Sequence, residues 1–407
     1  MKLGGRIRAD YSYSQAKDVS TVTGGAVALK TGASAMNKFG SEVRGRVDLD
    51  ARTPTPYGTV QAVTSIRLAR TTGVLADSSM AKDPADGTTA VTINSSAAAA
   101  TLEAAYIRFA GFTFGNAKDN FAFMPSIFYG AGHWPSFANG TNTIAYTAVL
   151  GGGFSATLGF QDAAYTAGKP LDGGVAGDPF FRYTAIPQIN ARLDWDQSWG
   201  TVAVKAATLR YELVDGTLSS GLPLASHSKQ VWAAGAGVKF NLPQLAAGDA
   251  LYLEGNYADG MTEYTINWGN AKSSDTKRNI AGLGFNPASV IDYANGIETV
   301  KSWNLAANFQ HFFAPQHRTT LLATYGGFKA PTSAKALAWD GKKGFGDGTV
   351  WNVGAQYAFL PTAGFEIGVE ALYARMKQDV ALTAAATSTT SRSDGAWTGR
   401  MRVERTF

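Results

Sequence analysis

The charged residues that could do chemistry in this chain stand at every second position, most clearly between Ser41 and Arg52. The even positions of this run are Glu42, Arg44, Arg46, Asp48, Asp50 and Arg52, and no odd position carries a charge. Side chains two residues apart point to the same face of a β-strand. The carboxylates resemble a cluster, but their alternation with arginines favours a solvated, salt-bridged wall. Its chemistry is electrostatic contact with water, ions and polar solutes.

Both ends of the chain show the same alternation. Leu3, Gly5, Ile7, Ala9 and Tyr11 alternate with Gly4, Arg6, Arg8 and Asp10, and Trp397, Gly399, Met401, Val403 and Phe407 alternate with a face that holds Arg400 and Arg402. An arginine turned to lipid at the bilayer midplane costs ~2–4 kcal/mol, so the charged faces must meet water. A strand of this kind is typical of an outer-membrane barrel. A half-buried strand of a soluble β-sandwich is the alternative.

The composition favours a membrane barrel over a soluble protein or a helical membrane protein. Charged residues make up 16% of the 407 residues, below the ~25% of soluble proteins, and aromatic residues make up 12%. Runs of ~18 apolar residues, which transmembrane helices need, are absent. The absence of Cys excludes a disulfide scaffold and a thiolate metal site. Without a composition break, we expect a single barrel domain over residues 1–407.

The start of the chain lacks the apolar segment of a signal peptide, because Lys2 is followed directly by Leu3-Gly4-Gly5-Arg6. A cytoplasmic protein is one interpretation. Because the strand pattern begins at once, we expect instead the mature chain of a protein of the outer membrane, with Met1 as an added start residue.

Short turns alternate with long irregular stretches along the chain, as periplasmic turns and external loops do in barrels. We expect short turns near 53–58, 110–112, 151–153, 196–200, 241–249, 314–318 and 361–364. We expect long loops near 71–100, 117–142, 164–178, 214–228, 258–296, 330–346 and 380–394. The strands between them number about sixteen, of which the strand near Thr113–Asn116 is the least clear. The predicted fold is all-β, a transmembrane antiparallel β-barrel closed between its first and last strands.

Several segments resemble the alphaproteobacterial general porins. They are the stretch from Ala105 to Gly115, the hairpin from Ile186 to Ala203, the stretch from Asn241 to Tyr252, and the two ends, Leu3–Tyr11 and Val403–Phe407. The resemblance implies a sixteen-stranded trimeric diffusion channel whose third external loop, here within 117–142, folds into the lumen as a constriction. The loop of that family usually starts with several acids. Here Asp119 stands alone beside Lys118 and His133, among aromatic residues such as Tyr129.

Barrel closure would bring the arginines of inward parity together, because the last strand then lies beside the first strand, and the second strand lies next to the first. The predicted basic wall consists of Arg400, Arg402, Arg6, Arg8, Arg44 and Arg46, with Arg67 and Arg192 as extensions. Glu42, Asp48, Glu366 and Glu370 are the other expected lumen acids. Since the third loop is poor in acids, we expect a weak preference for anions.

Other chemistries find little support. The four histidines, His133, His227, His311 and His317, do not form a metal-binding spacing, and no nucleotide-binding glycine motif is present. His311 could pair with a serine in a barrel hydrolase, but an interfacial histidine is the simpler interpretation. The net charge of +5 permits nucleic-acid binding, yet the basic residues alternate with apolar ones on strands. We therefore expect no enzyme activity, no cofactor, no metal and no nucleic-acid partner.

Two functions fit the pattern. The first is a passive, water-filled porin for small hydrophilic solutes and ions. The second is a surface barrel that serves mainly as an adhesin, receptor or structural anchor, with a narrow or plugged lumen. Outer-membrane lipid and lipopolysaccharide are the expected surroundings in both. If the chain forms a homotrimer, small residues of lipid-facing parity allow close contact between subunits: Gly5, Ala9, Gly45, Ala51 and Gly399.

Overall fold

The structure is a computed structural model. It describes residues 1–14, 39–75, 96–125, 128–129, 140–162, 170–171, 181–182, 186–213, 216–217, 223–224, 226–266, 289–292, 296–332, 345–381 and 389–407.

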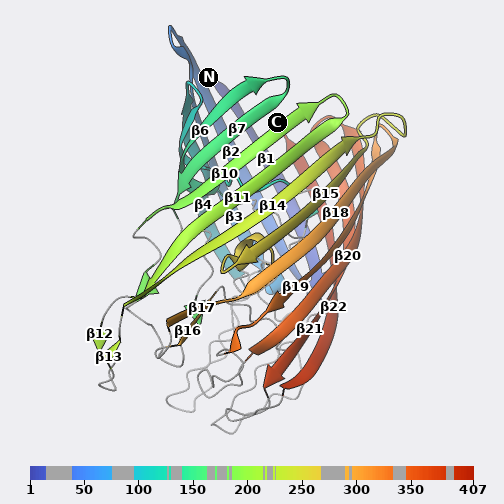
Figure 1. Cartoon of the computed structure of the whole chain (residues 1–407). Helices are drawn as coiled ribbons and strands as arrows, with labels where there is room; N and C mark the ends of the chain where they lie inside the picture. The colour runs from blue at the N-terminus through green and yellow to red at the C-terminus, as the bar shows by residue number, and fades with distance from the viewer. Residues whose placement is uncertain are drawn as a thin grey trace.

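Sixteen long strands form the closed barrel shown in Figure 1. They are β1 (Lys2–Ser14), β2 (Phe39–Thr55), β3 (Gly58–Thr72), β4 (Ser96–Phe109), β5 (Phe112–Lys118), β6 (Gly140–Gly151), β7 (Phe154–Gln161), β10 (Gln188–Gln197), β11 (Gly200–Leu213), β14 (His227–Asn241), β15 (Ala250–Asp259), β18 (Lys301–Ala314), β19 (His317–Lys329), β20 (Phe345–Thr362), β21 (Phe365–Ala381) and β22 (Thr389–Thr406). Each pairs antiparallel with the next, which confirms the predicted fold class.

Shorter elements lie between the barrel strands. They are β8 (Pro170–Leu171), β9 (Phe181–Arg182), β12 (Gly216–Thr217), β13 (Pro223–Leu224), β16 (Ser289–Asp292), β17 (Gly296–Thr299) and the 3-10 turns Gly73–Leu75 and Thr262–Tyr264. Among the residues described, no helix has the length and apolar character needed to cross a membrane.

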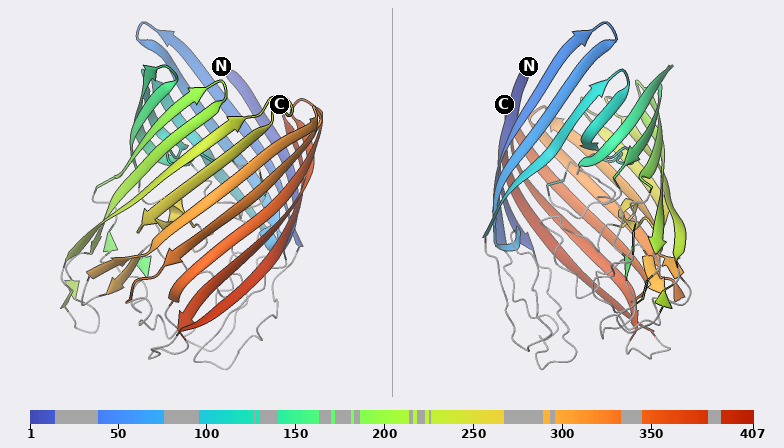
Figure 2. Two further views of the ribbon diagram at one scale, coloured as in Figure 1. Left: turned by 45° about the vertical axis from the view of Figure 1, so that its right-hand side comes forward. Right: turned by 90° about the vertical axis from the view of Figure 1, so that its left-hand side faces the viewer.

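The barrel closes between its first and last strands. Arg8 of β1 lies opposite Glu404 of β22, and the main chains of Gly5 and Phe407 exchange two hydrogen bonds of 3.0 and 2.9 Å. Closure leaves no open edge with unpaired backbone groups, which lipid would not tolerate. Both chain ends lie at the rim that carries the short turns, as the two views of Figure 2 show.

The outer surface of the barrel is apolar, as the alternation predicts. Leu3, Ile7, Val43 and Val47 are all more than half exposed. A belt of alternating tryptophan and tyrosine crosses the seven strands β14, β15 and β18–β22, and it consists of Trp232, Tyr257, Trp303, Tyr325, Trp351, Tyr373 and Trp397. Ring centroids of neighbours in the belt, such as Tyr373 and Trp397, lie 5.1 Å apart. Such belts mark the level of a membrane–water interface.

The predicted short turns are present, and glycines shape several of them. The turn between β4 and β5 consists of Ala110 and Gly111, which have φ angles of 48° and 87°. A two-residue hairpin turn of the type that follows strand twist requires positive φ at both positions. Glycine adopts this conformation without strain, whereas Ala110 adopts it at a cost.

Two predicted loops are too long, and one uncertain strand is real. β4 begins at Ser96, inside the predicted loop 71–100, and β21 and β22 extend to Ala381 and from Thr389, inside the predicted loop 380–394. These strand ends are rich in alanine, serine and threonine, so they lack the contrast between apolar and charged faces on which the prediction rests. The segment near Thr113–Asn116 is part of β5.

Candidate functional site

Seven of the eight predicted arginines lie on four adjoining strands. We call them the arginine wall: Arg400 and Arg402 on β22, Arg6 and Arg8 on β1, Arg44 and Arg46 on β2, and Arg67 on β3. The register places Arg8 opposite Arg44, Arg6 opposite Arg46, and Arg46 opposite Arg67. Barrel closure thus brings together residues nearly 400 positions apart. The eighth, Arg192, lies on β10, outside this group.

Carboxylates between the guanidinium groups compensate their mutual repulsion. Asp10 is buried and accepts hydrogen bonds from Arg402 at 2.6 and 2.9 Å. Glu42 contacts the guanidinium groups of Arg44 at 2.7 Å and Arg8 at 3.3 Å. Of these acids, Glu42 belongs to the predicted set, whereas Asp10 does not.

Asp48 and Glu404 complete this set of acids within the wall. Asp48, which belongs to the predicted set, pairs with Arg46 at 2.9 Å. Glu404, which does not, lies 3.7 Å from Arg6 and 3.8 Å from Arg8. The sequence parity alone indicates that these groups face inward, but not which pairs form.

Glu103 is a fifth acid of the wall, and the sequence analysis missed it. Its carboxylate oxygens lie 3.2 Å from Arg67, 3.3 Å from Arg46, 3.8 Å from Arg44 and 4.0 Å from Arg6. One carboxylate therefore lies at the centre of four guanidinium groups that come from three strands.

The wall arginines differ in how much of each side chain reaches solvent. The exposed fractions are 28% for Arg46, 24% for Arg67 and 23% for Arg6. They are 11% for Arg402 and 5% for Arg400. Arg8 and Arg44 are also largely covered, at 9% and 13%. The solvent-facing part of the wall thus consists of Arg6, Arg46 and Arg67, and the two arginines of β22 belong to its covered part.

The third loop, residues 119–139 between β5 and β6, follows the inner wall of the barrel where it is described. Arg192 of β10 donates to the main-chain oxygens of Asn120 at 3.3 Å and Ala122 at 2.7 Å. The main-chain N–H of Met124 donates to Glu254 of β15 at 3.1 Å. Successive loop residues thus bind successive regions of the inner barrel surface, and Arg192 holds the loop.

The far end of this segment is held by Tyr129. Its main-chain N–H donates to Glu370 at 2.5 Å and its hydroxyl donates to Glu366, both on β21. Its main-chain oxygen accepts hydrogen bonds from Arg400 at 2.6 Å and Arg402 at 3.2 Å, and the Arg402 guanidinium lies 4.3 Å from the ring centroid. The covered part of the arginine wall is therefore the attachment point of the loop.

Glycines of the inner wall make room for the loop side chains. A Cβ atom at Gly237, Gly354 or Gly368 would come closer than 3.0 Å to Phe123, Phe128 or Tyr129, respectively. A Cβ atom at Gly159 would likewise come closer than 3.0 Å to Asn120. These four glycines, on β7, β14, β20 and β21, form notches in the wall and fix the position of the loop.

Asp119 holds the near end of the loop. It is 3% exposed, and it accepts hydrogen bonds from the Phe121 N–H at 2.8 Å, Gln161 at 3.1 Å and the Tyr264 hydroxyl at 2.9 Å. Burial raises the pKa of the Asp119 carboxyl, although the three hydrogen bonds and the nearby Lys205 act in the opposite direction. Asp119, the one acid among the described loop residues, thus points into the barrel wall.

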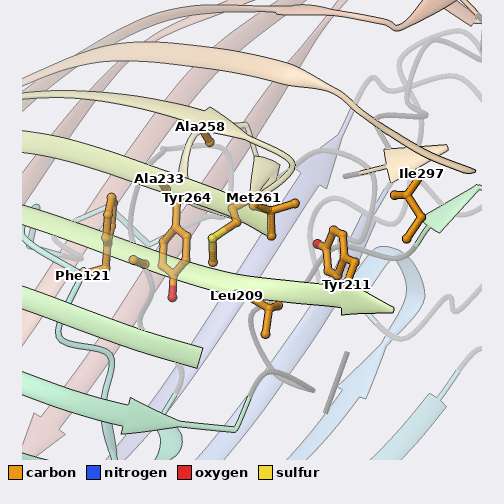
Figure 3. Packing of buried hydrophobic residues seen from close by; sticks show 10 residues of the cluster. Phe121, Leu209, Tyr211, Ala233, Ala258, Met261, Tyr264 and Ile297 are labelled. Atoms are coloured by element: carbon orange, nitrogen blue, oxygen red, sulfur yellow. The ribbon is translucent and has the colours of Figure 1, made fainter. Parts of the chain in front are cut away.

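A second segment, Met261–Ile266 after β15, packs inside the barrel together with the third loop. Tyr264 and Phe121 have ring centroids 4.2 Å apart. Figure 3 shows these two rings and Met261 beside Leu209 of β11. The Tyr264 hydroxyl also accepts from Gln161 at 3.0 Å and from Gln188. The inner face of β11, β14 and β15 is thus sealed by an apolar cluster.

A buried ion pair lies against this apolar cluster. Lys205 of β11 and Glu254 of β15 contact each other with side chains that are both 0% exposed, and the Lys205 ammonium lies 4.5 Å from the Phe121 ring centroid. A buried pair of this kind is costly unless further hydrogen bonds satisfy it. Glu254 meets this condition, since it also accepts from the Met124 N–H.

The remaining predicted residues lie as follows. Lys118 is the last residue of β5 and is exposed, whereas His133 lies outside the described residues. His311 contacts Asp249 at 2.6 Å, stacks on Phe309 and meets Phe313 edge-on near a short turn. Among the residues described, no group of three or more His, Cys, Asp or Glu side chains could hold a metal ion.

Comparison with known proteins gives one family and several similar folds. A family model described as a porin subfamily matches residues 1–400. The outer membrane channel DcaP of Acinetobacter baumannii is 15% identical, with a TM-score of 0.60, over 100% of this chain and 96% of that chain. OprB of Pseudomonas putida, in its high-pH structure, is 10% identical, with a TM-score of 0.51, over 100% and 94%.

A loop L8 deletion mutant of OmpT, an outer membrane protein of Vibrio cholerae, is 9% identical, with a TM-score of 0.50, over 100% of this chain and 98% of that chain. At these identities the likeness shows the fold alone. No curated protein sequence matches the chain.

Proposed function

The chain belongs to the porin subfamily of outer-membrane channels, and we propose that it is a water-filled pore for passive diffusion of small hydrophilic solutes and ions. In this proposal the whole chain, residues 1–407, acts as one barrel domain. The observation that carries it is the solvent-facing part of the arginine wall, where Arg6, Arg46 and Arg67 reach water inside the barrel.

The narrowest part of the pore lies between the third loop and the solvent-facing part of the arginine wall. The loop is attached to β10, β15, β21 and β22, so the solute path runs along β1–β3, next to the attachment on β22. A wall of charge facing an apolar loop creates a transverse field, which orients polar solutes and disfavours purely apolar ones.

The charge of the constriction supports a weak anion preference. The seven wall arginines pair with five wall acids, Asp10, Glu42, Asp48, Glu103 and Glu404, so the wall carries 7 − 5 = +2. Glu366 and Glu370 on the neighbouring strand β21 offset part of this positive charge. The third loop adds little negative charge to the lumen, because Asp119 is buried. A small net charge in a hydrated lumen is screened over a Debye length of ~8 Å, which keeps the preference modest.

The pore is of the alphaproteobacterial general porin type and forms a homotrimer in this proposal. The segments that resemble that family, together with the sixteen-stranded barrel, support this proposal. The small residues of the predicted subunit contact lie on the adjoining strands β22, β1 and β2, and they are Gly5, Ala9, Gly45, Ala51 and Gly399. Gly5 is buried beside the Phe407 ring. The family and the fold are those of channels, and the proposal includes no catalysis.

Electrical conductance in a planar bilayer tests this function against the alternative of an adhesin, receptor or anchor. A porin gives stepwise current increases that scale with the salt concentration. A barrel with a plugged lumen inserts without current steps, and this result would contradict the proposal.

A further inference from the structure

Glu103 lies on a β-bulge, which gives its side chain a direction that simple alternation does not provide. Thr101 of β4 pairs with Arg67 of β3, and Leu102 pairs with Ile66, but the next pair is Ala104 with Ser65. Glu103 is therefore an extra residue without a partner on β3. A bulge of this kind re-aims a side chain, and here it turns a carboxylate into the arginine wall.

The arginines around Glu103 depend on it to different degrees. Arg46 also pairs with Asp48 at 2.9 Å, and Arg44 also pairs with Glu42 at 2.7 Å. For Arg67, Glu103 at 3.2 Å is the carboxylate contact that the described residues provide, besides a hydrogen bond to Thr101. Glu103 is thus the shared counter-charge of the group.

The group also has more donors than acceptors. The Nε atoms of Arg6, Arg44 and Arg67 are buried, and the residues that the structure describes offer them no hydrogen-bond acceptor. Glu103 itself is 21% exposed, so it faces the water of the lumen together with the exposed arginines. Positive potential at this point of the wall is therefore limited by one carboxylate that solutes can approach.

We infer that Glu103 is the residue that sets how strongly this pore favours anions. The inference rests on the proposed function as a conducting porin. Removing the negative charge exposes four neighbouring guanidinium groups to each other and to passing ions. The free energy of an anion along the arginine wall then becomes lower, and that of a cation becomes higher.

The size of the change follows from Coulomb's law with screening. One unit charge about 7 Å from the path of an ion, in water and with a Debye length of ~8 Å, changes the Cl⁻ to K⁺ permeability ratio roughly two-fold. A larger change is expected where the lumen water is restricted, because the effective dielectric constant is then lower.

The test is the reversal potential in a KCl gradient for the wild type, Glu103→Gln, Asp50→Asn and the double variant Glu103→Gln with Arg67→Gln. Asp50 is the matched control, since it lies on the same inner face of β2 but outside the arginine wall, and it pairs with Arg52 at 2.8 Å and not with the group around Glu103. We expect Glu103→Gln to raise the Cl⁻ to K⁺ permeability ratio about two-fold or more. Asp50→Asn should have a smaller effect, and the double variant should return close to the wild type, because its net charge is unchanged.

Two results would overturn the inference while leaving the porin function intact. One is a conducting Glu103→Gln pore with the selectivity of the wild type. The other is an equal shift in Asp50→Asn, which would mean that any lumen acid has the same effect. If Glu103→Gln fails to fold, the double variant decides: a selectivity far from that of the wild type contradicts the inference. A wild type that does not conduct would instead refute the proposed function.

Discussion

The arginines of the wall divide into two groups by what their guanidinium groups touch. Arg400 and Arg402 bind the main-chain oxygen of Tyr129 and are mostly covered, whereas Arg46 and Arg67 pair with acids that share the lumen water. Sequence parity predicts that all of them face inward. It does not separate a residue that holds the third loop from one that meets solutes, because this difference depends on where the loop lies.

Asp119 leads to a prediction about pH. Burial raises the pKa of its carboxyl above the value of 3.8 that it has in an unfolded chain. Between these two pKa values the folded state binds more protons, so stability falls as the pH rises through this window and recovers on acidification. The wild type should therefore gain stability on acidification from the protonation of Asp119. Asp119→Asn removes this proton uptake. We expect the unfolding temperature of the Asp119→Asn variant in detergent to rise less on acidification than that of the wild type.

The unfolding temperatures of the wild type and the variant are measured over the same pH series, so that the effects of the other carboxylates cancel. A wild type and an Asp119→Asn variant whose unfolding temperatures change in parallel between neutral and acidic pH would contradict the raised pKa. Asp48→Asn is a suitable control, because its carboxylate is partly exposed in the lumen.

At the scale of elements, the third loop and the wall fit each other through glycines. Gly368→Ala would place a Cβ atom against the Tyr129 hydroxyl, and overpacking of this kind typically costs about 1–3 kcal/mol. We expect the loop end to move, so that single-channel conductance changes and current noise increases. Gly4→Ala is the matched control, because the nearest atom to a Cβ there is the Phe407 main-chain oxygen at 3.4 Å, an ordinary contact distance. Equal conductance in the two variants would show that the glycine notches do not position the loop.

The segment Met261–Ile266 gives a second prediction about elements. Tyr264→Phe removes a hydroxyl that donates to Asp119 and accepts from Gln161 and Gln188. Buried groups left without partners cost about 1–3 kcal/mol, so both inserted segments should loosen. The expected result is a lower unfolding temperature together with more frequent current fluctuations. An unchanged current trace would indicate that the apolar contacts alone hold the segment.

The elements also show how far the sequence could lead. Alternation predicts nearly every barrel strand, because lipid on one side and water on the other impose a period of two. It misses Glu103, since the bulge in β4 interrupts that period. It also misses the contact between Tyr264 and Asp119, which are 145 positions apart and meet only inside the closed barrel. Local patterns carry no information about such contacts.

At the scale of the whole molecule, the aromatic belt over β14–β22 and the small residues of the adjoining strands suggest different surroundings for different sides of the barrel. We expect a protein mass in mild detergent close to three times 42.9 kDa. Gly45→Trp, which adds bulk to the proposed contact, should increase the fraction of monomer. A wild type with the mass of one chain would contradict the trimer, and an intact Gly45→Trp trimer would place the contact elsewhere.

The charge of the constriction is the central claim, and the reversal potential of the pore in a KCl gradient tests it most directly. We predict a modest preference for Cl⁻ in the wild type. Arg44→Gln combined with Arg46→Gln should shift the pore toward K⁺, because the net charge of the wall then falls from +2 to zero. A clear cation preference in the wild type that persists in the double variant would show that the arginine wall does not set the field.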